Sequence, residues 1–186
     1  TVNYAYNNRY LVTSTVRQDN TSRFSKANAD AIFPSASFGW VLSDEDFYSS
    51  DNYMKLRVSY GTLGNQSLGR TAPDHNISHL SAANAYYPFD GLSISTGAAL
   101  SAVGNPDLQW ETVVSANVGL DFRLMDNKLY GSVDYFNITT NDLIAVDESL
   151  IGTTAIDASA PLVNIGQVSN TGIELALNYA DATSGG

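Results

Sequence analysis

The sequence predicts an all-β fold: a segment of an antiparallel up-and-down transmembrane β-barrel with about seven strands, short periplasmic turns and long extracellular loops. Three observations support this fold class. Apolar and polar residues alternate with a period of two along most of the 186 residues, as in a strand with one apolar face. Short and long connections alternate between these runs, which is the layout of an outer-membrane barrel. Only 15% of the residues are charged, which is few for a surface that lies wholly in water.

Seven runs carry the alternation, and several of them reach the 9–11 residues that a tilted strand needs to cross a membrane. The longest run places Val118 and Leu120 on one face, and Asp121 and Arg123 on the other. In chain order, the predicted strands are residues 2–6, 10–17, 34–43, 54–61, 110–124, 129–136 and 173–179.

Two turns fix the strand register. Asp126-Asn127 predicts a two-residue hairpin loop that places Leu120 opposite Val133 and Phe122 opposite Gly131. Both faces stay uniform across this hairpin, whereas a slip of one residue would mix them. Residues 7–9 predict a second short loop, with Tyr6 opposite Tyr10.

The remaining connections give the barrel its two ends. We expect a moderate connection at 44–52 and long ones at 18–33, 62–109 and 143–169. The apolar face should meet lipid and the polar face a wet lumen, with aromatic girdles at the two interfaces. The girdle candidates are Tyr6, Tyr10, Phe47, Tyr48 and Tyr53 at the short-turn side, and Tyr60 and Trp110 at the long-loop side.

Seven strands are too few to close a membrane barrel, whose minimum is eight, and open edges are not tolerated in lipid. The chain is therefore expected to be a piece of a larger barrel, or one protomer of a barrel shared between several chains. Composition narrows the functional class further. The absence of cysteine excludes a disulfide scaffold and a zinc–thiolate site. Nine basic against nineteen acidic residues argue against a nucleic-acid partner.

Several short strings occur in the order of a known family. They are residues 9–17 with 19 and 22–24, 33–40, 55–61 with 64–66, 105–112, 119–122, 131–136 and 170–175. Together they resemble the SusC/RagA-type TonB-dependent outer-membrane transporters, and they cover most of the chain outside the 71–102 loop.

The resemblance implies a 22-stranded barrel with an N-terminal plug, in the bacterial outer membrane and in contact with its lipid. It implies energy supplied by TonB through the N-terminal region, a SusD-like surface lipoprotein as partner, and import of oligosaccharides or peptides. On this resemblance residues 1–186 are part of the barrel domain, and the plug domain and the last strands are absent from the chain.

Two groups of side chains are candidates for contact with substrate. The first lies in the long loop: Tyr86, Tyr87 and Phe89, whose rings could stack on sugars, pack on the lipoprotein or pack within the loop. The second lies on the lumen face: Arg57, Glu111 and Arg123. For lumen charges, which also include Lys55, Asp121, Asp134 and Glu174, wall hydration and ion pairing with a plug are the favoured interpretation.

No motif predicts catalysis, a metal site or a cofactor. No Ser-His-acid arrangement is locally supported, and His75 and His79 have metal-ligand spacing without an evident third ligand. The Asp44-Glu45-Asp46 cluster is interpreted as a solvated turn rather than a calcium site. We therefore expect a protein that is not an enzyme.

Two alternatives stay open at this stage. A soluble β-sandwich carbohydrate-binding module would bury Leu56, Val118, Leu120 and Leu177 in a packed core. A passive porin-like barrel would lack the plug domain.

Overall fold

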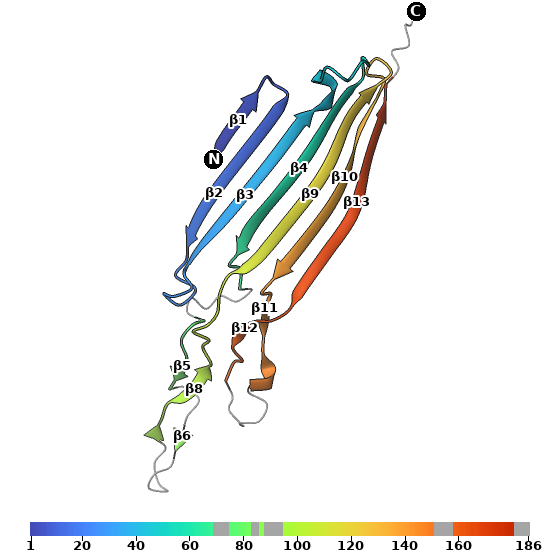
Figure 1. Cartoon of the computed structure of the whole chain (residues 1–186). Coiled ribbons are helices and arrows are strands. Elements are labelled where there is room, and N and C mark those ends of the chain that lie inside the picture. Colours follow the sequence, from blue (N-terminus) through green and yellow to red (C-terminus); the bar gives the residue numbers. More distant parts are fainter. Residues whose placement is uncertain (69–74, 83–85, 88–94, 151–157, 181–186) are drawn as a thin grey trace, which may run out of the picture.

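The computed structural model describes residues 1–68, 75–82, 86–87, 95–150 and 158–180. Seven long strands form one antiparallel sheet in which each strand pairs with its neighbours in the order β1-β2-β3-β4-β9-β10-β13 (Figure 1). The strands are β1 (Val2–Tyr6), β2 (Tyr10–Asn20), β3 (Asp30–Val41), β4 (Tyr53–Asn65), β9 (Glu111–Leu124), β10 (Leu129–Asn141) and β13 (Gln167–Tyr179). The predicted up-and-down segment is confirmed, and the sheet does not close into a barrel.

The short and long connections lie at opposite ends of the sheet (Figure 1). At what we call the turn end, residues 7–9, 42–52 and 125–128 join the strands, and η1 (Leu42–Asp44) lies in the second of these connections. At the loop end, residues 21–29, 66–110 and 142–166 form the long connections.

The two longest connections contain short elements that the sequence did not predict. The pairs are β5 (His79–Ser81) with β8 (Ala99–Ala102), β6 (Tyr86–Tyr87) with β7 (Ser95–Thr96), and β11 (Ile144–Val146) with β12 (Leu162–Asn164). A short 3₁₀ helix, η2 (Glu148–Leu150), follows β11. These segments are too short for a periodic signal to stand out in the sequence.

The predicted hairpin register is confirmed, and the Lys128 N–H donates to the Met125 carbonyl at 3.1 Å across the predicted turn residues 126 and 127. Leu120 pairs with Val133 and Phe122 with Gly131. The last pair is Leu124 with Leu129, so residues 125–128 form the loop, and the residues at 125, 126 and 127 all have positive φ. Asp and Asn tolerate that conformation better than most residues.

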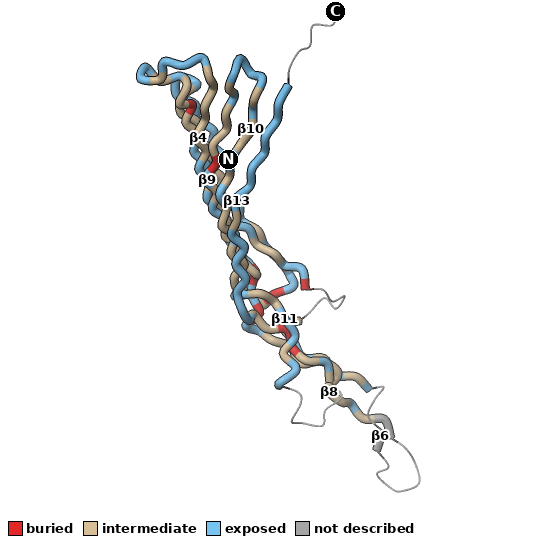
Figure 2. Tube along the Cα trace, turned by 90° about the vertical axis from the view of Figure 1, so that its right-hand side faces the viewer, coloured by how far each residue is buried: buried red, intermediate tan, exposed pale blue. Residues whose placement is uncertain are grey.

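The outer face of the sheet is apolar and open. One row across it contains Tyr10, Trp40, Leu56, Leu120, Val133 and Leu175. Val118 is 45% exposed and Leu177 is 60% exposed, and no second sheet of the described residues covers this face. Figure 2 shows the sheet from its side as a thin layer in which few positions are buried. The β-sandwich alternative is therefore wrong, because its core would have buried these side chains.

The largest buried cluster lies at the loop end, where the long connections meet the sheet. Its members are Phe24, Phe33, Leu68, Leu108, Trp110 and Leu162. The Trp110 ring packs edge-on against Phe24 and Phe33, with centroid distances of 5.5 and 5.6 Å. Its Nε1 donates to the carbonyl of Ala29 at 3.3 Å. The predicted girdle position of Trp110 is thus wrong: the strand pairing begins at Glu111, so the alternation does not extend to this residue.

Among the described residues, no helix has the length and the apolar character needed to cross a membrane.

Candidate functional site

The inner face of the sheet carries small polar residues at its middle and charged residues toward the turn end. The middle rows contain Thr13, Ser37, Ser59 and Asn117, and Thr15, Ser35, Gly61 and Ser115. The next rows contain Arg57, Gly119, Asp134 and Glu174, then Lys55, Asp121, Ser132 and Ala176, and finally Tyr53, Arg123, Tyr130 and Asn178. These rows confirm the face assignment made from the alternation.

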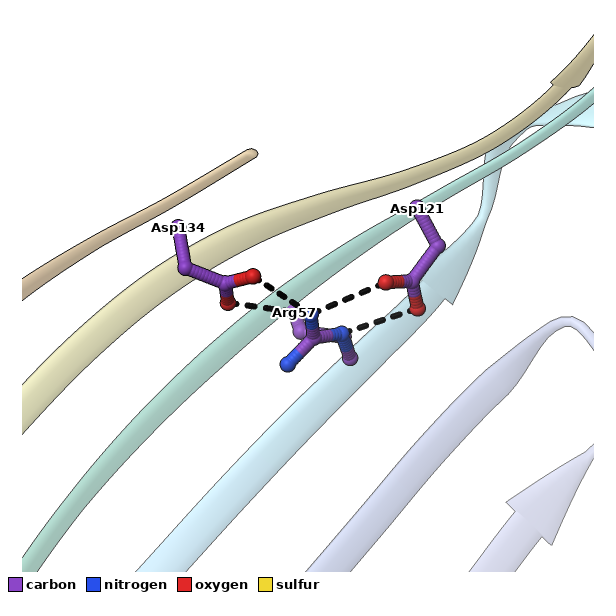
Figure 3. Close-up of polar contacts among 3 residues, drawn as sticks. All are labelled: Arg57, Asp121 and Asp134. Atoms are coloured by element: carbon purple, nitrogen blue, oxygen red, sulfur yellow. Dashed lines mark hydrogen bonds and ion pairs between the residues drawn. The ribbon is translucent and has the colours of Figure 1, made fainter. Parts of the chain in front are cut away.

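Arg57 holds three strands together (Figure 3). Its Nε and Nη2 donate to the two carboxylate oxygens of Asp121 at 2.8 and 2.9 Å. Nη2 also donates to Asp134 at 2.9 and 3.2 Å. The guanidinium, on β4, thus reaches carboxylates on both β9 and β10. Fork-shaped pairing of this kind is stronger than a hydrogen bond between neutral groups. The Arg57 guanidinium is therefore held by the sheet, which forms the barrel wall.

Gly119 makes this reach possible. It lies between Arg57 and Asp134 in the row that crosses the three strands. A Cβ atom at this position would overlap Asp134 Oδ1 and would lie 2.8 Å from Arg57 Nη2. Only glycine therefore leaves a path for the guanidinium across β9.

Glu111 lies at the other end of β9 and also serves the wall. Its Oε1 accepts from Asn65 Nδ2 at 3.0 Å, and its Oε2 accepts from the backbone N–H of Ile144 at 3.4 Å. The carboxylate thereby links β4 to the start of the third long connection.

Arg123 differs from Arg57 because its partner is an aromatic ring and not a carboxylate. Its guanidinium carbon lies 5.3 Å from the centroid of the Tyr53 ring, within the range of a cation–π contact. Within the part of the chain that the structure describes, Arg123 makes no ion pair. Tyr53, predicted to belong to a lipid-facing girdle, instead lies on the inner face opposite Arg123.

Arg123 lines a cavity of about 350 Å³ at the turn end of the inner face, which we call the turn-end hollow. Its other lining residues are Tyr53, Lys55, Asp121, Phe122, Tyr130, Gly131, Ser132, Ala176 and Asn178. Strands β4, β9, β10 and β13 all contribute to it.

The three loop aromatics are placed only in part. The backbone of Tyr86 pairs with Thr96 and that of Tyr87 with Ser95, so these residues lie on a small hairpin within the second long connection. Phe89 lies outside the described residues.

The second and third long connections are joined to each other. Ala102 and Ser159 form a parallel bridge. Asn164 Nδ2 donates to the carbonyls of Gln109 and Asp142, both at 2.9 Å, and its Oδ1 accepts from the N–H of Gln109 at 2.9 Å. Asn164 thus links the segment that leaves β10 to the one that enters β9, in addition to the Ala102–Ser159 bridge.

At the turn end the structure gives the Glu45 carboxylate three partners that the sequence did not predict. Glu45 accepts from Arg9 Nη1 at 3.0 Å, from the Tyr10 hydroxyl at 2.5 Å and from Trp40 Nε1 at 2.8 Å. Hydrogen bonds from Tyr10 and then Trp40 are the largest causes that lower the pKa of the Glu45 carboxyl. The interpretation of this residue as a solvated turn acid was wrong, since its side chain is only 11% exposed.

No group of three or more His, Asp or Glu side chains suited to a metal ion occurs in the described ranges.

The chain is similar to known proteins in both sequence and fold. The family described as "TonB dependent receptor-like, beta-barrel" matches residues 1–185. TonB-dependent receptor P3 of Formosa agariphila is 35% identical over 186 residues, which is 98% of this chain and 18% of that protein. TonB-dependent receptor SusC of Bacteroides thetaiotaomicron is 34% identical over 95% of this chain and 18% of its own length.

Solved structures agree. The RagAB peptide importer in its "closed-closed" state superposes with a TM-score of 0.77 at 28% identity, over 97% of this chain and 19% of that one. The siderophore receptor PirA of Pseudomonas aeruginosa, at 21% identity and a TM-score of 0.57, covers 93% of this chain and 29% of that one and shares the fold. The chain spans about a fifth of the length of the curated relatives that it matches.

Proposed function

The chain belongs to the TonB-dependent receptor family of outer-membrane β-barrels, and from this premise we propose that the protein containing it imports nutrients across the outer membrane. The observation that carries the proposal is the two-sided sheet. Its outer face exposes a continuous apolar surface suited to lipid, and its inner face presents hydroxyl, amide and charged groups suited to a wet lumen. The loop end then faces the cell exterior and the turn end the periplasm.

We propose further that the importer draws energy from TonB, works with a SusD-like surface lipoprotein and carries oligosaccharides or peptides. The likeness to SusC supports the first two points, and a similar structure is described as a peptide importer. In this arrangement residues 1–186 supply part of the barrel wall, and the plug domain and the remaining strands belong to the rest of the protein. The role is passive shaping and binding, without catalysis.

The side chains proposed to contact cargo differ in whether other residues of the wall already bind them. Arg57 and Glu111 are held by partners within the wall, so we infer that they shape the lumen and do not bind cargo directly. Tyr86, Tyr87 and Phe89, in the second long connection, are proposed to make the first contacts with cargo. Arg123 is proposed to act later, in the lumen.

A transport assay tests this proposal. The Tyr86→Ala/Tyr87→Ala double variant of the full-length transporter, in its native outer membrane, should lose about tenfold in uptake at limiting cargo, because two aromatic contacts of a binding hot spot contribute at least about 1.4 kcal/mol together. Peptide and oligosaccharide uptake are measured in parallel. Tyr135→Ala, on the lipid-facing side, is the control and should retain uptake.

Unchanged uptake and affinity in the double variant would remove the loop tyrosines from cargo capture. Full uptake in cells that lack TonB would overturn the importer class itself.

A further inference from the structure

We propose that the turn-end hollow is a binding site for a carboxylate group. The proposal rests on the proposed function only in taking the inner face to line the lumen of an intact barrel. Its ligand is a single carboxylate, brought either by a part of the same protein that lies outside this chain or by cargo in transit.

The charges in the hollow favour one anion. Lys55 and Arg123 line it, and in the described part of the chain neither makes an ion pair. The third charged group in the lining, Asp121, is already held by both nitrogens of the Arg57 fork. The hollow thus presents two cations whose counter-charges are missing, in a chain whose overall net charge is −10.

The neighbouring groups limit the charge of the ligand. Lys55, Arg57 and Arg123 carry three positive charges, and Asp121 and Asp134 carry two negative ones. One monoanion neutralises this set, whereas a phosphate dianion would leave it negative. Glu174 lies opposite Asp134 in the same row and is left out of this set because, in the described part of the chain, it neither lines the hollow nor pairs with Arg57.

The walls of the hollow suit a carboxylate held in a fixed orientation. The Tyr53 ring lies beside the Arg123 guanidinium at 5.3 Å, which limits the rotation of that side chain. Tyr130, Ser132 and Asn178 add a phenol, a hydroxyl and an amide along the same lining, and each of these can donate a hydrogen bond to oxygen. Two cations and three neutral donors can satisfy the lone pairs of one carboxylate.

Either source can bring a carboxylate to this point. The chain spans 18% of the length of its relatives, so most of the protein lies outside it and can extend an acidic side chain into the lumen. Cargo that crosses the lumen also passes the turn end before it is released, and a peptide carries a carboxylate at its C-terminus.

The test measures how fast Lys55 is acetylated by an amine-reactive ester in the full-length transporter, purified in detergent, with mass spectrometry as the readout. An ammonium held by a carboxylate loses its proton less readily, and a shift of one pKa unit corresponds to about tenfold slower labelling. Lys26, which is exposed at the loop end, is the internal reference. The transporter is labelled alone, with succinate, and with the uncharged succinamide.

Two variants and one salt condition separate ion pairing from simple shielding. Arg123→Gln should release the protection of Lys55, whereas Arg123→Lys should keep much of it. A salt concentration of about 1 M, at which the Debye length is about 3 Å, should also release it. Each variant is first checked for the folded barrel by its mobility on a gel with and without heating.

The outcomes distinguish the two sources of the carboxylate and also test the proposal itself. Protection of Lys55 in the transporter alone, released by salt and by Arg123→Gln, supports a carboxylate from the same protein. Protection that appears only with succinate supports a carboxylate from cargo. Equal labelling of Lys55 and Lys26 under all conditions overturns the proposal, as does protection that neither salt nor Arg123→Gln changes. None of these readouts depends on uptake, so a failure here is distinguishable from a failure of the importer function.

Discussion

Replacing Gly119 with alanine should break one specific contact of the wall. The added Cβ would overlap Asp134 Oδ1 and crowd the Arg57 guanidinium, so the Arg57–Asp134 pair is lost while the bidentate pair with Asp121 can remain. Hydrogen bonds to charged groups contribute about 1.5–3 kcal/mol. Arg57 is 36% exposed and Asp134 14% exposed, so solvent screening reduces the loss to about 1–2 kcal/mol.

The matched control is Gly39→Ala, at the neighbouring position of the same inner-face row on β3. There the nearest atom to an added Cβ is Lys55 Cε at 3.1 Å, the end region of a flexible side chain that can move. Alanine at either position also reduces the freedom of the unfolded chain, which stabilises by about 0.4–1 kcal/mol. Because this gain is common to both variants, the difference between them isolates the Arg57–Asp134 contact.

The assay is equilibrium unfolding of the full-length barrel in guanidinium chloride, followed by its mobility on a gel without heating. We expect Gly119→Ala to unfold at lower denaturant than Gly39→Ala, with a free-energy difference of about 1–2 kcal/mol. Equal midpoints for the two variants would refute the reasoning, because they would show that the guanidinium does not need the space above Gly119.

Two further predictions concern the ends of the wall. Because hydrogen bonds lower the pKa of Glu45, its contribution to stability is complete above the ordinary carboxyl pKa and is lost as the pH falls through the lowered value. Fluorescence of Trp40 in the intact barrel should therefore change only in acid, and Glu45→Gln should remove that transition; an unchanged transition in Glu45→Gln would contradict this. Asn164→Ala should loosen the third long connection where it meets Gln109, at a cost of about 1–3 kcal/mol for the unsatisfied backbone groups, and speed limited proteolysis of residues 142–166 severalfold. A cleavage rate equal to that of the unmodified protein would show that Asn164 does not hold these segments.

Strand pairing could be predicted from the sequence because it depends on a local pattern. Alternation assigns each residue to a face, and a short turn then fixes the register for the whole hairpin. Phe122 illustrates this: it was placed over Gly131 from numbering alone, and its ring does lie 3.1 Å from where a Cβ of that glycine would be. The aromatic ring covers the strand position that has no side chain of its own.

The alternation fails where the chain leaves the sheet. Trp110 precedes the first paired residue of β9 by one position, and its ring turns into the cluster of Phe24 and Phe33. The partners of that cluster come from three connections that are distant in the sequence, and no local pattern brings them together. The role of Glu45 escapes the local pattern for a similar reason, since two of its donors, Arg9 and Tyr10, precede it by 36 and 35 positions in the sequence.

The candidate site shows most clearly what a face assignment leaves undecided. The alternation along the strands places Arg57, Lys55 and Arg123 on one face. By charge alone, all three are equally good candidates for binding an anionic ligand. The structure separates them through the side chains next to them. The Arg57 guanidinium crosses β9 above Gly119 and is paired with two carboxylates. Arg123 instead stacks on Tyr53, which does not neutralise its charge. Gly119, which lies directly opposite Arg57 on the neighbouring strand, therefore decides whether this guanidinium reaches its second carboxylate, that of Asp134. It follows that a side chain at Gly119 should separate Asp134 from Arg57 and weaken the wall, and should leave the guanidinium with Asp121 as its remaining carboxylate.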